Sequence, residues 1–331
     1  RYQAQGLHAG LNLIATHLNR ELRPNTTVVY RQHYAQGFDF LNVSADYGYV
    51  NHRFSANGET AMNKDGALAT INSFSMQLNG EWSLMALQRF YSYRYTTLYG
   101  RSFSDGGSVQ NESGLYLGLT WQPSPRLKLM MYGDYAYFPW AKYQVSQSSH
   151  AWDYLTQLSY SPKHWTFTGR YRLRLRQRDN EAKTALMQKA EHRGRVSAEY
   201  GRELQIPDNK GQGWAWNSRT QVDFGYTSFR QRDAGLMVSE TLGMTLGWLR
   251  LNGGIGYFRT DSYDSRVFLY EQGPLYTYSF TQFYGEGIRY YLMIRASINK
   301  QLMLTAKLGT TNYFDRSTIG SSYQQINASS Q

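Results

Sequence analysis

The sequence predicts an all-β fold, an antiparallel transmembrane outer-membrane β-barrel of about 16 to 18 strands with short periplasmic turns and longer extracellular loops. Three observations predict it. Apolar and polar residues alternate along many segments, which places them on opposite faces of a strand. The 331 residues include 29 Tyr, 15 Phe and 8 Trp but only 7 Pro, a composition that favours strands. The connections between the segments alternate between short and long, which is typical of such barrels.

The bulk hydropathy is compatible with this fold. A mean hydropathy of -0.60 is low for a membrane protein, but a barrel is apolar only at alternate residues. The sequence contains no run of about 18 apolar residues, which excludes a transmembrane helix. It contains no Cys, which excludes a disulfide scaffold and thiolate metal sites. The barrel is therefore the membrane architecture that remains.

Period-2 segments recur from one end of the chain to the other. In the first, Leu7, Leu11 and Leu13 share one face and His8 and Asn12 share the opposite face. Comparable alternation fills the ranges 41–49, 115–121, 152–160, 191–200, 214–226 and 288–295. No segment with the 3.6-residue period of a helix competes with them. We therefore expect every regular element to be a strand.

The strongest single segment is 163–178. An extended chain places Arg170, Arg172, Arg174, Arg176 and Arg178 on one face. The other face carries Trp165, Phe167, Tyr171, Leu173 and Leu175. A strand with lipid on one side and a wet lumen on the other accommodates both faces.

The connections predict the orientation of the barrel. Short turns are expected near 79–80, 122–125, 161–163, 248 and 299–300, and long links at 93–110, 139–149, 179–187 and 262–285. All seven prolines fall between the alternating segments, where a sheet tolerates them. The count reaches about 16 strands if 26–33 is one of them. With short turns on the periplasmic side, both ends of the chain fall on the long-loop side. We therefore expect residues 1–331 to be a single barrel domain excerpted from a longer chain, lacking its N-terminal region and final strand.

The arginines form the candidate functional site. We expect Arg170, Arg172, Arg174, Arg176, Arg193 and Arg195 to form a cationic ladder in the lumen, which would attract an anionic passenger or line a constriction. The alternative is a structural cross-strand network in which the counter-charges Asp153, Glu191, Glu199 and Asp223 neutralise the ladder. Barrel lumens commonly carry such networks, so the sequence favours this alternative.

The sequence predicts no catalytic residues, no metal site and no cofactor. Residues 51–58, Asn-His-Arg-Phe-Ser-Ala-Asn-Gly, are similar to the His-x-Ser-Asn-Gly signature of outer-membrane phospholipases. A Ser-His pair on one strand needs an even separation to share a face, and His52 and Ser55 are three residues apart. The seven His residues show no metal-ligand spacing.

Two aromatic clusters have two interpretations. The first contains Tyr91, Tyr93, Tyr95 and Tyr99, and the second lies within 276–284. Such rings can stack on bases or sugars. They can also form the aromatic girdle at the membrane interface, which is the interpretation that the sequence favours.

Three stretches carry a family resemblance. The first is LQRFYSYRYTTLYGRSFSDGGSVQNESGLYLG at 87–118, the second is DYAYFPW at 134–140, and the third is PLYTYSFTQFYGEGIRYYLMIRASINKQLMLTAKLGTTNYFDR at 274–316. Together they resemble the C-terminal β-barrel region of a family of Bacteroidota outer-membrane proteins that carry an N-terminal competence-type helix-hairpin-helix segment. That segment is not in this sequence. The resemblance implies an outer-membrane barrel and, through the missing segment, a link to DNA.

These observations lead to ranked expectations about function. The first is a non-enzymatic conduit, or a gated or plugged barrel, in envelope transport, with an anionic polymer such as DNA as cargo. A net charge of +11 suits polyanionic partners, including lipopolysaccharide and nucleic acid. The second is a structural or assembly subunit that binds other envelope proteins. The third and least favoured is an outer-membrane lipid-modifying enzyme.

Overall fold

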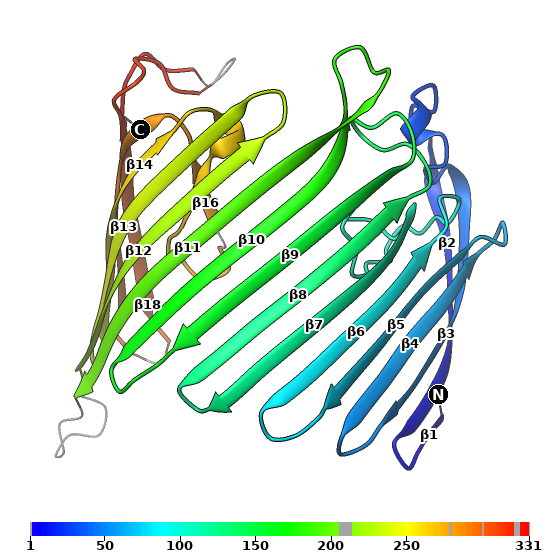
Figure 1. The fold of residues 1–331 in the computed structure, drawn as a ribbon, viewed down its shortest axis with the longest axis horizontal. Helices are drawn as coiled ribbons and strands as arrows, with labels where there is room; N and C mark the ends of the chain where they lie inside the picture. The colour runs from blue at the N-terminus through cyan, green and yellow to red at the C-terminus, as the bar shows by residue number, and fades with distance from the viewer. Residues whose placement is uncertain (1, 205–213, 278–279, 300, 321–324, 331) are drawn as a thin grey trace. The chain divides into compact units, whose positions relative to one another are not determined.

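A computed structural model describes residues 2–204, 214–277, 280–299, 301–320 and 325–330. It is an all-β structure with a 16-stranded sheet in which every strand pairs with its neighbours in chain order (Figure 1). All the strand pairs with a described register are antiparallel, so the sheet is a meander. Among the described residues, no helix is long and apolar enough to cross a membrane.

The strands before the midpoint of the chain are β1 (Tyr2–Ala4), β2 (Leu7–Leu22), β3 (Gly37–Val50), β4 (Phe54–Asn63), β5 (Leu68–Gln77), β6 (Trp82–Tyr91), β7 (Glu112–Ser124), β8 (Leu127–Phe138) and β9 (Ser149–Tyr160). The later strands of the same sheet are β10 (Trp165–Asp179), β11 (Leu186–Leu204), β12 (Trp214–Ser228), β13 (Arg232–Leu246), β14 (Leu249–Thr260), β17 (Glu286–Ser297) and β18 (Met303–Tyr313). A separate hairpin of β15 (Val267–Tyr270) and β16 (Phe280–Phe283) lies in the connection between β14 and β17. Two single-turn 3-10 helices, η1 (Val29–Arg31) and η2 (Tyr263–Ser265), lie in connections.

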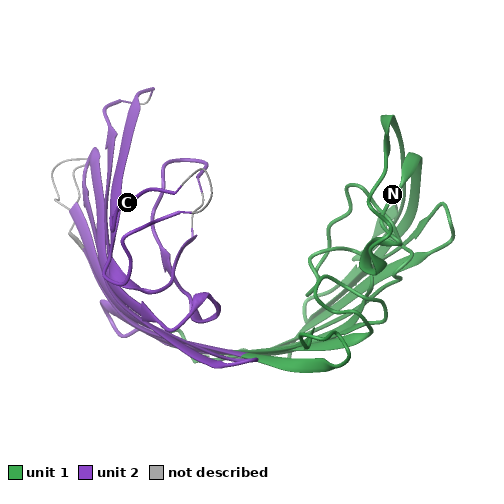
Figure 2. Cartoon of the chain, turned by 90° about the horizontal axis from the view of Figure 1, so that it is seen from above, with its two compact units in different colours: residues 1–156, 173–190 green, residues 157–172, 191–331 purple. Residues whose placement is uncertain are grey.

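The chain divides into two compact units, shown in different colours in Figure 2. Unit 1 contains residues 1–156 and 173–190, and unit 2 contains residues 157–172 and 191–331. In both units the sheet has an apolar face and a polar face, because successive side chains of a strand point in opposite directions.

The apolar face of each unit is exposed. In unit 1 it includes Leu11, which is 83% exposed, and Leu117, which is 55% exposed. In unit 2 it includes Leu242 at 56% and Leu308 at 74%. Burial of apolar surface is the main force that folds a protein in water, so these faces are unlike the exterior of an ordinary water-soluble domain.

The polar face of each unit is partly covered by its own loops. In unit 2, Val267, Leu269 and Phe283 from the β15–β16 hairpin pack on Met237 and Phe258 of the sheet. This cluster is the largest hydrophobic core among the described residues. Gly235 of β13 allows η2 to lie close to the sheet, since a Cβ at this position would lie 2.2 Å from the carbonyl oxygen of Ser265.

Asparagine side chains close three of the short turns. Asn79 Oδ1 accepts hydrogen bonds from the backbone N–H groups of Glu81 and Trp82, each at 2.9 Å. Asn51 and Asn299 make the same pair of bonds to the residues two and three positions later. Such Asx turns reverse the chain within a few residues, which explains the short connections. The predicted turns at 79–80, 161–163 and 248 are confirmed.

Several predictions about the elements are wrong. Residues 26–33 are not a strand, because Asn25 Oδ1 accepts from Thr27 N at 3.1 Å and starts a turn that leads into η1. The strand β1, which was not predicted, pairs with β2 and completes the count of 16. Pro123 lies inside β7, where the pairing with β8 shifts register, as proline in a sheet requires.

The alternation of connection lengths is correct for the long links at 92–111, 139–148 and 261–285. If short and long connections alternated throughout, the connections 64–67 and 229–231 would be long, but both are short. The connection between β11 and β12 includes residues outside the described part of the chain. The strand order runs from β1 to β18, and no pairing between these two strands is recorded among the described residues.

Candidate functional site

The predicted ladder residues lie on two adjoining strands. Arg170, Arg172, Arg174 and Arg176 lie on β10, and Arg193 and Arg195 lie on β11, which neighbours β10 in the sheet. Their spacing of two residues along each strand places those of one strand on one face.

Several ladder residues bind carboxylates. In unit 1, Arg174 Nε donates to Asp153 Oδ2 of β9 at 3.0 Å. In unit 2, Arg195 Nε donates to Asp223 Oδ1 of β12 at 2.6 Å. These two pairs are the cross-strand network that the sequence analysis gave as the alternative to an unneutralised ladder.

The other predicted counter-charges have different roles. Glu199 accepts from Arg219 Nε of β12 at 2.9 Å, and Arg219 was not among the predicted ladder residues. Glu191 lies on β11. Arg193 donates to the carbonyl oxygen of Arg266 at 3.3 Å, and its guanidinium lies 4.9 Å from the ring centroid of Phe268. Arg193 therefore contacts the end of η2 and β15 as well as belonging to the strand β11.

A second loop also binds the ladder. Arg176 Nη2 lies 2.5 Å from Oδ1 of Asp105, which belongs to the loop 92–111 of unit 1. This carboxylate was not predicted as a counter-charge, because a loop residue has no strand position from which its face can be deduced.

A fully buried charge cluster holds the same loop on the polar face of unit 1. Arg89 of β6 binds Glu112 of β7 through Nε and forms a bidentate pair with Asp134 of β8 at 2.7 and 3.1 Å. The side chains of Arg89 and Glu112 are 0% exposed. Glu112 also accepts the backbone N–H groups of Asp105 and Gly106, at 2.8 and 2.7 Å. The register of β6 and β7 brings these side chains together. Arg89 pairs with Gly114, and Glu112, two residues before Gly114, points to the same face of the sheet.

Arg89, Glu112 and Asp134 were not among the predicted site residues. Arg89 and Glu112 belong to the first stretch that carries the family resemblance, and Asp134 begins the second. The signal was therefore present as a motif. The missing information was that residues 45 positions apart meet, which only the strand order reveals.

In unit 2, Glu271 holds the loop 261–285 on the sheet. It accepts from Arg289 of β17 at 2.7 and 3.0 Å and from Lys307 of β18 at 2.9 Å. Its side chain is 0% exposed. Burial alone would raise the pKa of Glu271, but the bonds from Arg289 and Lys307 outweigh burial and hold the pKa below its usual range. Glu271 is therefore an anionic anchor for the loop.

Between this loop and the polar face of unit 2 lies a cavity of about 270 Å³. Arg195, Glu199 and Arg219 line it from the strands, and Leu269 and Gln272 line it from the loop. Of the predicted ladder residues, Arg195 thus faces a cavity beneath a loop.

The candidate enzymatic segment has a different geometry from the one assumed. His52 is exposed in the turn between β3 and β4, and Ser55 lies on β4. The two residues are therefore not on one strand, so their odd separation does not decide whether they share a face. Ser55 Oγ accepts from Asn57 Nδ2 at 2.6 Å. In the described part of the chain, no group of three or more His, Asp or Glu side chains is arranged to hold a metal ion.

The first aromatic cluster is split by its environment. Tyr91 and Tyr95 are 1% and 4% exposed and belong to a small core, so they cannot stack on a ligand in this conformation. Tyr93 packs parallel to Trp140 at 5.3 Å between ring centroids. The second cluster lies partly outside the described residues.

Comparison with known proteins found no match to a protein-family model and none to a curated protein. The structure itself defines the fold class: this is an all-β protein whose sheet is a 16-stranded antiparallel meander.

Proposed function

We propose that this chain is a non-enzymatic outer-membrane β-barrel that acts as a gated conduit in the envelope of a bacterium. The observation that carries the proposal is the contrast between the two faces of each unit. Large apolar side chains such as Leu11, Leu117 and Leu308 are exposed on one face. Charged and hydrogen-bonded side chains occupy the other.

Outer-membrane lipid explains the apolar face. In a barrel, outward side chains contact acyl chains and inward side chains contact water, so one strand carries both kinds. Aromatic residues near the strand ends fit the same view, since Trp82 stacks on Trp121 at 5.5 Å beside short turns. Lipid and lipopolysaccharide are then the first partners, and exposed loop surfaces would contact other envelope proteins.

The loops on the polar face support gating. If the polar face lines a lumen, the loop 261–285 lies in that lumen, held by Glu271 on Arg289 and Lys307. The loop 92–111 is held in the same way by Glu112 and by the pair of Asp105 with Arg176. Such loops restrict passage until their anchors are released.

Single-channel conductance of the protein in a planar bilayer tests this proposal. Glu271→Gln weakens the anchor and is expected to raise the open probability above that of the wild type. Glu59→Gln is the matched control, because Glu59 is an exposed carboxylate on the polar face of β4 in unit 1. It makes the same change in charge without touching the loop 261–285, so it is expected to leave the open probability unchanged.

Equal currents from both variants and the wild type would contradict gating by this loop. Silence in all three, with protein inserted in the bilayer, would contradict the conduit itself.

An anionic polymer, DNA included, is the proposed cargo. The net charge of +11, the six ladder arginines against four predicted counter-charges, and the family resemblance support it. If Lys and Arg neutralise about six phosphates, raising the salt concentration from 50 to 200 mM is expected to weaken DNA binding by roughly a thousandfold. A dissociation constant that changes little over this range would exclude phosphate recognition by Arg and Lys.

A structural or assembly subunit is the second candidate. It is favoured by the pairing of Arg174 with Asp153 and of Arg195 with Asp223, and by the hydrophobic core between hairpin β15–β16 and the sheet. A filled barrel of this kind carries no steady current, so the same conductance experiment separates the two candidates.

A further inference from the structure

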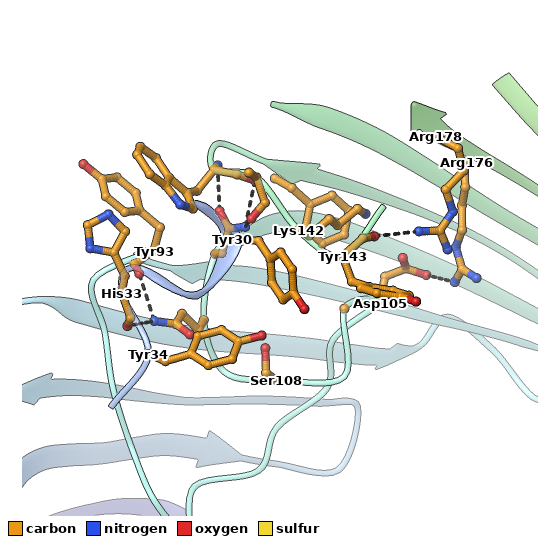
Figure 3. Close-up of a pocket in the computed structure, with 16 residues that line it drawn as sticks. Tyr30, His33, Tyr34, Tyr93, Asp105, Ser108, Lys142, Tyr143, Arg176 and Arg178 are labelled. Carbon is orange, nitrogen blue, oxygen red and sulfur yellow. Dashed lines mark hydrogen bonds and ion pairs between the residues drawn. The ribbon is translucent and has the colours of Figure 1, made fainter. Parts of the chain in front are cut away.

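Unit 1 contains a cavity of about 300 Å³, and Arg176 is the one predicted ladder residue that lines it (Figure 3). Its walls come from three loops, 23–36, 92–111 and 139–148, and from the end of β10. We call it the loop pocket. Residues far apart in the sequence meet there, among them Tyr30, Tyr93, Lys142 and Arg178.

Side-chain hydrogen bonds join the three loops. Gln110 Nε2 donates to the carbonyl oxygens of His33 and Tyr93, at 2.6 and 2.9 Å. Trp140 Nε1 donates to the carbonyl oxygen of Val29 at 3.0 Å. The Asn111 amide donates to the carbonyl oxygen of Trp140 and accepts from its backbone N–H, at 2.9 and 2.8 Å. The walls are therefore preorganised, which lowers the entropy lost when a ligand binds.

Aromatic rings form two walls of the pocket. His33, Tyr93 and Trp140 pack together with centroids 4.8 to 5.3 Å apart. Burial, with a smaller contribution from Arg94, lowers the pKa of His33, which disfavours the charged form of this wall residue. Tyr30 packs edge-on against both Tyr34 and Tyr143, at 6.2 and 5.9 Å. Despite these contacts, Tyr34 is 41% exposed and Tyr143 is 64% exposed.

The remaining side of the pocket is cationic. Lys142 Nζ lies 3.2 Å from the ring centroid of Phe138. Arg176 is held by Asp105, and Arg178 donates to the carbonyl oxygen of Tyr143 at 3.0 Å. No ion pair of Lys142 is recorded among the residues that the structure describes. Burial lowers the pKa of Lys142 to about 8, because a partly buried ammonium loses hydration. An anion beside it would relieve that cost.

The wall geometry favours a sugar over a nucleobase. A base is best held between parallel rings, whereas Tyr30 meets its neighbours at 74° and 73°. Phenol hydroxyl groups and the hydroxyl of Ser108 can exchange hydrogen bonds with sugar hydroxyls, and ring faces can pack on the C–H face of a pyranose. The volume is at the small end of the range for ligand pockets.

We propose that the loop pocket binds one acidic sugar residue, with its carboxylate at Lys142 and its ring against the tyrosines. The sugar is either free or the end of a saccharide chain. This inference goes beyond the proposed function and does not depend on it, because binding at the loops needs no conducting lumen.

Isothermal titration of the full chain in detergent with sodium D-glucuronate tests the proposal. Saturable binding is expected, with D-glucose binding at least tenfold more weakly because it lacks the charge. Lys142→Met is expected to weaken glucuronate binding by about tenfold or more, the value of a hydrogen bond to a charged group. Lys128→Met is the matched control, since Lys128 is exposed at the short-turn end of β8, and it is expected to bind like the wild type.

A second variant keeps the test clear of folding defects. Tyr143 is largely exposed, so Tyr143→Ala is expected to retain the circular dichroism of the wild type while losing affinity for glucuronate. Absence of saturable glucuronate binding to folded wild type would overturn the proposal. So would unchanged affinity in Lys142→Met, or inorganic phosphate binding as tightly as glucuronate, which would mark a simple anion site.

A uronate disaccharide distinguishes the two sources of the sugar. Tighter binding of the disaccharide than of the monosaccharide would identify a chain end as the ligand, and equal binding would identify the free sugar.

Discussion

Arg89 is a fully buried cation in unit 1 that is bound by two carboxylates, those of Glu112 and Asp134. Replacing it with Met would leave Glu112 and Asp134 buried without a cation. We expect Arg89→Met to lower the free energy of unfolding by about 3–5 kcal/mol, as for other broken buried ion pairs. Urea unfolding of the folded protein in lipid vesicles measures it.

Arg174→Met is the control for this prediction. The Arg174 side chain is 29% exposed and pairs with Asp153 alone among the bonds described above. A partly solvated pair contributes little, so the expected loss is about 1 kcal/mol or less. If both variants lost the same free energy of unfolding, burial would not determine how much Arg89 contributes to stability.

Sequence reasoning reached the strand residues of the site more easily than the loop residues. The face of Arg174 or Asp153 follows from its position in an alternating run, since the period of a strand is fixed by the backbone. The place of Asp105 does not, because loop residues have no period. The partner of Arg89 likewise depends on which strands adjoin and in what register, and local pattern carries neither.

The loop 261–285 is an element whose attachment depends on one carboxylate. The pKa of Glu271 in the folded protein lies below its ordinary value of 4.5. Its stabilising contribution is therefore complete above about pH 4.5 and is lost as the pH falls through the lower folded value. We expect amide hydrogen exchange in η2 and β15, corrected for intrinsic rates, to accelerate roughly ten- to hundredfold on acidification.

Two variants check the assignment to Glu271. Glu271→Gln is expected to show fast exchange in η2 and β15 already at pH 6, with little further change on acidification. Glu59→Gln removes an exposed carboxylate on the polar face of β4 in unit 1, away from this loop, and is expected to keep the acceleration. Acceleration that persists in Glu271→Gln would assign the pH response to a different group.

Among the elements, the sequence located the alternating strands well and the irregular ones poorly. The segment 163–178 matches β10 almost residue for residue. A strand was predicted at 26–33 because residues 26–30 are all β-branched or aromatic, and such residues favour strands. The hydrogen bonds of Asn25 at the start of the segment override that preference.

At the scale of the whole molecule, the proposed membrane location makes the two faces unequal in their tolerance of charge. Leu117→Arg would place a guanidinium on the apolar face of β7. We expect it to lower the free energy of unfolding in vesicles by about 2–4 kcal/mol if Leu117 lies near the membrane midplane. Thr120→Arg, on the polar face of the same strand, is expected to cost much less. Equal costs for the two variants would argue against lipid at the apolar face.

The meander has a consequence for how the chain acquires its structure. The strands of the 16-stranded sheet pair in the order in which they occur in the chain, with the β15–β16 hairpin inserted between β14 and β17. Asn51, Asn79 and Asn299 each reverse the chain within a few residues. Ordering a short loop costs less entropy than ordering a long one, so these hairpins can form before distant strands meet. The natural unit of assembly is then a hairpin of two strands rather than a single strand, because the hairpin pairs the backbone groups on its inner edges, about half of the total, before it enters a bilayer.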